Sequence, residues 1–302
     1  GSGRASAIAA DADDAASLAA AVRGADVVLN CVGPFYRFGP PILSAAIAAG
    51  ADYVDVCDDL DATVAMLGLD AAARSAGVRA LVGMGNSPGL ANVLVRFCSD
   101  HLLDRVESAD IMHVHGGEPD EGPGVLKHRI HAMTSDVPLF LDGEFITVRM
   151  LEPSGRAHAQ ETEFPDVGTC TVHPYPHPET VTLPRHIPGL RRATNLGAVV
   201  PAEYFALTME AVRMGICADE PIDVGGVPVA PIDFTVAYLR ARRPGLLAAA
   251  GLTAPRGCLK VEVSGEKDGE PHQFVFSMSS GAAGAGEGTG IPAALGAILT
   301  LR

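Results

Sequence analysis

The sequence predicts an α/β protein in which a Rossmann-type parallel-sheet domain is followed by a domain of mixed α+β structure. Strand-length apolar runs alternate with helix-length segments up to about residue 105, and residues 116–190 are instead rich in Pro, Gly and His. A glycine-rich segment then precedes a final helix of small residues. The expected divisions are therefore residues 1–105, 106–280 and 281–302.

The first division alternates strands with helices. Residues 25–33 (ADVVLNCVG) carry their apolar side chains in a run, as a strand covered on both faces does. Strands and helices alternating at this spacing imply right-handed crossovers and a parallel sheet. The expected strands are 5–12, 25–33, 52–58 and 78–85. The expected helices are 13–24, started by Asp and closed by Gly, then 39–49, 61–76 and 87–103, with Pro88 in the first turn.

The second division is strand-rich. A strand begins near residue 105, EFITVRML (144–151) resembles another, and helices are expected at 201–214 and 231–249. Residues 258–280 alternate apolar with polar side chains around a Lys-Asp-Gly turn, which predicts a β-hairpin. Residues 281–302 are expected to be a glycine-rich loop that opens a helix.

The opening of the nucleotide-binding fold is missing from the pattern. Such a fold normally begins with a strand, a G-x-G-x-x-G loop and a helix, and the first residues here already follow that unit. A parallel sheet without its central strand would expose apolar surface. We therefore expect that about 40 opening residues belong to the protein but precede this sequence.

Composition excludes several classes of function. A net charge of −14 argues against nucleic acid and anionic membrane as partners, because both are polyanions. The six cysteines form no CxxC pair and are expected to be reduced, buried residues of a cytoplasmic protein. No signal peptide or apolar run of membrane-spanning length is present in the sequence.

Four segments carry a resemblance to a known family. They are ADVVLNCVGPFYRFGPPILSAAIAAGADYVDVCDD (25–59), GMGNSPGLANVLV, HPETVTLPR and GTGIPAALGAIL. In this order and spacing the chain resembles the saccharopine dehydrogenase-like family, which includes saccharopine reductases, lysine 6-dehydrogenases and carboxynorspermidine dehydrogenases. The departures are the missing Gly-rich loop and an end soon after GAILTLR.

The resemblance implies an NAD(P)-dependent oxidoreductase that transfers hydride at an amine or imine carbon of an amino-acid-like substrate. It implies a cofactor domain (1–105), a substrate domain that often holds a homodimer contact (106–280), and a C-terminal segment returning to the first domain (281–302). Two alternatives stay open. One is a C=C or C=O reductase of a polyketide or lipid pathway, although GMGNSPGLAN is closer to the amino-acid side of the family. The other is a degenerate Rossmann protein that binds a partner without catalysis.

The cofactor, NAD or NADP, is expected at the ends of three strands, where α/β folds bind ligands. Small residues after the strand at 25–33 permit close approach, and Pro34 fixes the chain. A tight turn without a ligand is the alternative interpretation. The predicted cofactor-binding residues are Asn30, Cys31, Val32, Gly33, Pro34, Phe35, Asp55, Cys57, Gly85 and Asn86.

The predicted catalytic residues are Asp58 and His128, either of which could take a proton from a substrate ammonium group. Capping of the next helix by Asp58 or Asp59 is the alternative for the acidic run, and capping is also expected of Ser87. A solvent-exposed helix face is the alternative for the segment that holds His128.

Three further residues are predicted to bind substrate. Tyr36 follows the cofactor loop and is expected near the mouth of the site. Lys127 and Arg185 could hold a substrate carboxylate, Arg185 in a bidentate manner. No metal is predicted, because His113 and His115 share a strand face without a recognisable acidic or Cys partner.

Overall fold

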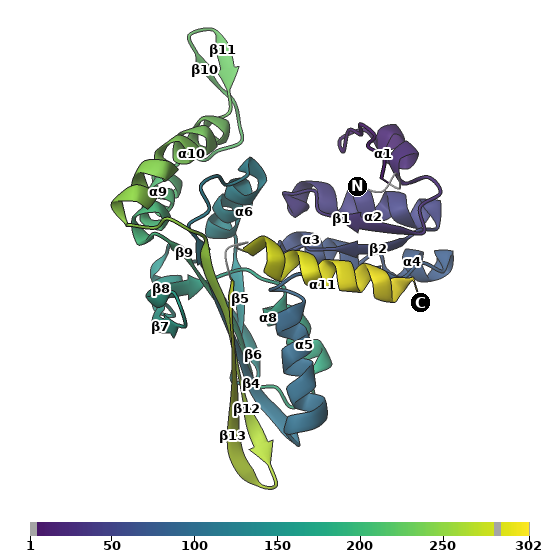
Figure 1. Cartoon of the computed structure of the whole chain (residues 1–302), viewed down its shortest axis with the longest axis vertical. Coiled ribbons are helices and arrows are strands. Elements are labelled where there is room, and N and C mark those ends of the chain that lie inside the picture. Colours follow the sequence, from purple (N-terminus) through teal and green to yellow (C-terminus); the bar gives the residue numbers. More distant parts are fainter. Residues whose placement is uncertain (1–4, 281–284, 302) are drawn as a thin grey trace.

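The computed structural model describes residues 5–280 and 285–301, and its two main sheets lie side by side, with a separate two-stranded hairpin (Figure 1). The smaller sheet is parallel, in the order β1-β2-β3. Its strands are β1 (Val27–Asn30), β2 (Asp52–Asp55) and β3 (Ala80–Leu81). The α/β class and the parallel sheet predicted for the first division are confirmed.

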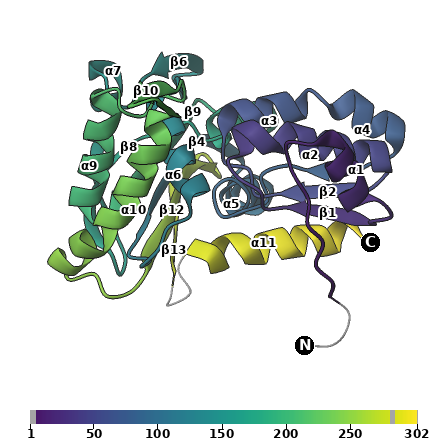
Figure 2. The ribbon, with the colours of Figure 1, turned by 90° about the horizontal axis from the view of Figure 1, so that it is seen from above.

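Helices cover both faces of this small sheet (Figure 2). On one side lie α1 (Ala15–Val22), α2 (Phe35–Ala49), α3 (Leu60–Leu67) and α4 (Asp70–Ala76). On the other lies α11 (Ala285–Thr300), which packs against β1 and β2 and so brings the end of the chain back to its beginning. A Cβ added at Gly296 of α11 would touch Leu81 and Val54, so the helix lies close on the strands.

Several expected elements of the first division differ. Residues 5–12 form no strand and are almost all exposed, because no neighbouring strand pairs with them in the part of the chain that is described. The helix expected at 61–76 is two helices, since the chain turns at Gly68. The helix expected from residue 87 begins at Leu90, after Gly89 takes a positive φ of 114°. Residues 285–290 are the first turns of α11 rather than a loop, and residues 281–284 lie outside the described residues.

The larger sheet has eight strands and forms the second half of the molecule. Its order is β13-β12-β4-β9-β5-β6, with β8 pairing to both β9 and β7. The strands are β4 (Arg105–Gly116), β5 (Val137–Leu141), β6 (Glu144–Val148), β7 (Gln160–Phe164), β8 (Gly168–Pro174), β9 (Arg192–Val200), β12 (Arg256–Lys267) and β13 (Glu270–Ser280). The hairpin predicted at 258–280 is confirmed as β12 and β13, joined at a turn with Asp268 at φ 54°.

Two groups of helices pack on this sheet. One group, α6 (Pro123–Thr134), α9 (Ala202–Arg213) and α10 (Pro231–Ala249), shares an apolar cluster, and α9 and α10 confirm the predicted helices. The other group, α5 (Leu90–Phe97), its π-helical extension η1 (Cys98–Leu102) and α8 (Glu179–His186), shares a cluster with β4 and β12. The short α7 (Pro153–Arg156) and the hairpin β10 (Ile222–Val224) and β11 (Val227–Val229) complete the described elements.

Helix α6 is where the two halves of the molecule meet. A Cβ added at Gly124 in its first turn would lie 3.2 Å from the carbonyl oxygen of Gly33, at the end of the small sheet. A side chain at this position would need the two backbones to move apart by a few tenths of an ångström, so glycine suits the close approach. As a result, the residues that follow on α6 lie opposite the loops that end β1 and β2.

Candidate active site

The loop after β1 ends the small sheet with backbone that faces outward. Asn30 is buried, with its amide donating to the Tyr53 hydroxyl at 2.9 Å and its side-chain oxygen accepting from the Val32 amide at 2.9 Å. Cys31, Val32 and Gly33 are exposed, whereas Pro34 and Phe35 are buried. The expectation of buried cysteines is therefore wrong for the exposed Cys31 and for the half-buried Cys170 and Cys217, although all six cysteines are free thiols.

Asp55 and Cys57 are fully buried and hold the end of β2 together. The Asp55 carboxylate accepts from the Cys57 and Gly83 amides at 3.1 and 2.6 Å, and from the Tyr53 hydroxyl at 2.8 Å. The Cys57 thiol donates to the carbonyl oxygen of Asp59 at 3.5 Å. Both side chains are thus used in hydrogen bonds within the small sheet. At these positions only the nearby backbone could contact a cofactor.

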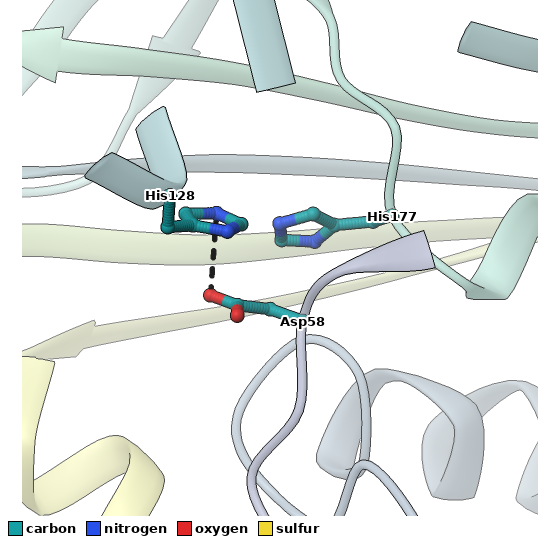
Figure 3. A group of neighbouring side chains, drawn as sticks. All are labelled: Asp58, His128 and His177. Atoms are coloured by element: carbon teal, nitrogen blue, oxygen red, sulfur yellow. Dashed lines mark ion pairs between the residues drawn. The ribbon is translucent and has the colours of Figure 1, made fainter. Parts of the chain in front are cut away.

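Asp58 and His128, predicted separately from the sequence, lie together at the junction of the two halves (Figure 3). The nitrogen Nε2 of His128 is 3.4 Å from Asp58 Oδ2. Its other nitrogen, Nδ1, is 2.6 Å from Oδ1 of the buried Asp59. The second carboxylate oxygen of Asp59 accepts from the Tyr36 amide at 2.9 Å. Asp59 precedes α3, but its side chain makes no capping bond, so the capping interpretation of Asp59 is wrong.

Two carboxylates around one imidazole favour its charged form. Burial opposes the charge, but Asp58 and Asp59 outweigh it and raise the pKa of His128 to about 9. Burial also raises the pKa of the Asp58 carboxyl, against the pull of His128. The three side chains form one array from which a proton can be given or taken.

A second imidazole–carboxylate contact lies beside the first. His131, one turn along α6, has Nε2 3.0 Å from Asp61 Oδ2. The ring of Tyr36 lies 4.2 Å from the His131 ring, centroid to centroid. Burial, followed by nearby acidic groups, raises the pKa of Tyr36 to about 12, which keeps its hydroxyl protonated. Tyr36 therefore lies at the edge of the predicted site.

Sequence reasoning missed a group on the side of the larger sheet. His177 and Glu179 follow β8 in the segment HPET, and both are buried. The Ser87 hydroxyl donates to Glu179 Oε1, so Ser87 does not cap α5. Asn195 donates to the same oxygen at 3.3 Å, and its own oxygen lies 3.0 Å from His113 Nε2. The segment HPETVTLPR carries the family resemblance and Arg185; the signal in it that could have found this group is a His and a Glu two residues apart.

Glu179 is the unusual member of this group. It is fully buried, and its Oε2 has no hydrogen-bond partner among the described residues; this oxygen lies 3.9 Å from His177 Nδ1. Burial raises the pKa of Glu179 to about 7, despite the bond from Ser87. Burial, together with neighbouring His113 and His128, holds the pKa of His177 well below its usual value. His177 is therefore neutral and can act as an acceptor.

The two predicted carboxylate clamps lie apart from this array. Lys127 points to Asp233 of α10, with Nζ 2.7 Å from Oδ1. Arg185 lies near the end of α8 and is exposed. Their roles in substrate binding stay predictions.

A buried ion-pair cluster fixes the helix that carries His128. Arg129 and Arg243 are each 1% exposed, and both contact the Glu121 carboxylate. The Tyr204 hydroxyl donates to the same carboxylate at 3.0 Å. Arg129, next to His128, is thereby fixed inside the larger half, so the histidine is held in a constant direction.

The loops at the end of the small sheet fit part of a dinucleotide. The exposed backbone of Cys31 to Gly33 and the half-exposed Asn86 form one edge, at the position where parallel α/β sheets bind nucleotides. A Cβ at Gly33 would meet nothing within 4 Å, so there is open space beside this backbone. A Cβ at Gly288 of α11 would lie 3.6 Å from Asn86, so the helix borders the same edge. This edge suits a ribose–nicotinamide unit.

Comparison with known proteins bears on this arrangement. Residues 1–81 match the model of the saccharopine dehydrogenase NADP-binding domain. The first part of the chain is therefore similar to this NADP-binding domain. The predicted cofactor class, NAD or NADP, and the predicted oxidoreductase activity are confirmed by that match and by the relatives.

Two relatives match this chain along most of its length. A carboxyaminopropylagmatine dehydrogenase of Synechocystis is 24% identical over 92% of this chain and 72% of its own. A carboxynorspermidine synthase of Vibrio alginolyticus is 25% identical over 89% of this chain and 66% of its own. The apo saccharopine dehydrogenase (L-Glu forming) of Saccharomyces cerevisiae, 16% identical, superposes with a TM-score of 0.63 over 98% of this chain and 81% of that one, which confirms the fold.

Among the described residues, no helix has both the length and the apolar character needed to cross a membrane.

Proposed function

We propose that this saccharopine dehydrogenase-like protein oxidises or reduces a small, amino-acid-like substrate at a carbon that bears an amine or imine. The observation that carries the proposal is the Asp58–His128–Asp59 array, placed beside the loops that end the parallel sheet. NAD or NADP, when bound, supplies the hydride acceptor or donor. The protein's own part is to hold the substrate nitrogen and to exchange one proton with it.

The proton exchange is assigned to Asp58 and His128. Asp58 is 36% exposed in its side chain, so it can reach a substrate ammonium, whereas the buried Asp59 is reserved for His128 Nδ1. Asp59 thus fixes the ring so that Nε2 faces Asp58 and the substrate nitrogen. The closely packed rings of His113, Tyr175 and His177, from β4 and the segment after β8, limit the access of water to that side.

The charge of the site favours an amine over a neutral substrate. Asp58, Asp59 and Asp61 surround two imidazoles, so an arriving cation is attracted. The names of both relatives denote carboxylated amines, which supports a substrate with a carboxylate and more than one nitrogen. A carboxylate would be held by Arg185, or by Lys127 after it leaves Asp233.

The alternatives are less well supported. A polyketide or lipid reductase needs an apolar surface for its substrate, and the residues that meet at this junction are acidic and imidazole groups. A protein that only binds a partner has no need for a buried carboxylate, that of Asp59, directed at His128.

We propose further that the protein is a cytoplasmic homodimer. The free thiols support a reducing compartment. Apolar side chains exposed on β10, β11 and α10, including Ile222, Val224, Val227 and Phe234, support a partner surface on the larger half. Sedimentation equilibrium of a monomer at micromolar concentration would contradict the dimer.

The test combines binding with kinetics. Calorimetric titration of the full-length protein with NADH and NADPH is expected to show micromolar binding of one of them. Asp58→Ala and His128→Ala are expected to lower kcat/KM for the amine substrate by about 10²–10⁴-fold, without changing cofactor affinity. Asp70→Asn, in the exposed ion pair with Arg74 on α4, is the matched control. Unchanged kcat/KM in both alanine variants would refute the assignment, and a folded protein that binds neither cofactor would refute the enzyme.

A further inference from the structure

Three side chains from distant parts of the sequence converge at the junction (Figure 3). Asp58 follows β2, His128 lies on α6, and His177 lies between β8 and α8. One carboxylate oxygen and one nitrogen from each ring lie within 4.8 Å of one another. Because they are far apart in the chain, no spacing in the sequence indicates this set.

The separations suit a small divalent cation. Metal–ligand bonds of about 2.1 Å at tetrahedral angles place neighbouring ligand atoms about 3.4 Å apart. The distance from Asp58 Oδ2 to His128 Nε2 is already 3.4 Å. The contacts to His177 lie within 4.8 Å and need to shorten by about 1.4 Å at most, which small side-chain rotations provide.

Each imidazole is also oriented from behind, as histidine ligands of metals usually are. His128 Nδ1 faces Asp59 at 2.6 Å, and His177 Nδ1 faces the Ser87 hydroxyl at 3.4 Å. These contacts leave the Nε2 atoms of both rings for a ligand. Independently, Oε2 of the buried Glu179, which has no hydrogen-bond partner among the described residues, lies 3.9 Å from His177 Nδ1. A carboxylate therefore also lies on the side of the His177 ring that faces away from the cation.

We propose that Asp58, His128 and His177 bind a divalent transition-metal cation of the zinc type, with a fourth position open. Two nitrogens and one oxygen favour zinc or cobalt over magnesium or calcium, which prefer all-oxygen sites. The cation takes the same atoms of Asp58 and His128 that the proposed reaction uses for its proton. Metal and substrate therefore exclude each other, and the cation inhibits; only this inhibition rests on the proposed function.

The test measures binding directly. Protein treated with a chelator is titrated with Co²⁺, which gives a visible absorption band in a tetrahedral site, and with Zn²⁺ by calorimetry. One equivalent is expected to bind, and Mg²⁺ is not expected to compete. His177→Ala and Asp58→Asn are each expected to weaken Zn²⁺ binding about 100-fold or more, and Asp59→Asn about 10-fold. His186→Ala, an exposed histidine on α8, is the control.

A neighbouring group, Asp59, Asp61 and His131, offers the competing location. Loss of the Co²⁺ band in His131→Ala but not in His177→Ala or Asp58→Asn would overturn the assignment, as would the absence of any binding. If His177→Ala fails to fold, Asp58→Asn decides, because Asp58 is partly exposed. Cofactor titration of the metal-free protein keeps the tests separate: cofactor binding without Zn²⁺ binding refutes the metal site alone.

Discussion

Replacement of Glu121 by Gln tests how α6 is held. The carboxylate of Glu121 is 8% exposed and contacts the guanidinium groups of Arg129 and Arg243, each 1% exposed. Gln keeps the shape but removes the charge, which leaves two buried cations with less compensation. Breaking a buried ion pair in this way costs about 3–5 kcal/mol. We expect the free energy of unfolding to fall by that amount at pH 7.

The pH dependence gives a second estimate of the same quantity. Burial opposes ionisation of Glu121, but Arg129 and Arg243 outweigh it and lower its pKa from 4.5 to about 2. At about 1.4 kcal/mol per unit this corresponds to about 3 kcal/mol of stability. Because the pKa is depressed in the folded state, this stability is fully present above pH 4.5 and is lost as the pH falls through 2.

Guanidinium unfolding followed by circular dichroism at pH 7 and pH 3 measures both effects, since the chain has no Trp. The difference between wild type and Glu121→Gln is expected to shrink at pH 3. Asp120→Asn is the matched control: its side chain is 76% exposed and pairs with Arg240, so about 1 kcal/mol or less is at stake. A loss below 1 kcal/mol for Glu121→Gln, or an equal loss at both pH values, would show that the cluster does not anchor α6.

Two further predictions concern the junction and the loop before α5. Asp59→Asn removes a charged acceptor at 2.6 Å from His128 and is expected to lower kcat/KM about 10–100-fold in steady-state kinetics. The control Asp70→Asn, in an exposed pair with Arg74, is expected to change kcat/KM less than about threefold, and equal effects of the two variants would contradict the orienting role of Asp59. Gly89→Ala is expected to lower the unfolding midpoint markedly, because φ is 114° and the new Cβ would lie 2.3 Å from a backbone oxygen. The control Gly245→Ala lies inside a helix, where a new Cβ meets nothing within 4 Å, and it is expected to raise the free energy of unfolding by about 0.5–1 kcal/mol. A loss of stability in Gly89→Ala smaller than this gain would contradict the strained loop.

The fold could be predicted where local pattern and tertiary packing agree. The apolar run at 25–33 predicts one buried strand and the alternation at 258–280 predicts a hairpin of two strands, and all three strands are present. The pattern at 5–12 is equally strand-like, but a strand needs a paired neighbour, and none reaches these residues among those described. Local propensity cannot supply that information.

Individual residues of the candidate site could be predicted from the sequence, but their contacts could not. The position of Asp58 after a strand and of His128 on a helix could be inferred from the sequence, whereas their contact depends on how two sheets meet. Ser87 has the side chain of a helix cap, but the helix starts after Gly89 and the hydroxyl bonds to Glu179 instead. His177 lies on the connection between β8 and α8, and Glu179 is the first residue of α8, a helix that the sequence pattern did not predict.

Helix α6 has a consequence for how the molecule turns over substrate. Its Arg129 is tied to the larger half, while His128 and His131, one turn apart, hold Asp59 and Asp61 of the smaller half. Two side-chain contacts from one helix thus hold the two halves together. Any hinge motion that moves the halves apart to admit substrate breaks the contacts of both histidines at once and takes His128 away from Asp58. The proposed proton exchange at Asp58 and His128 can therefore take place only while the two halves are closed.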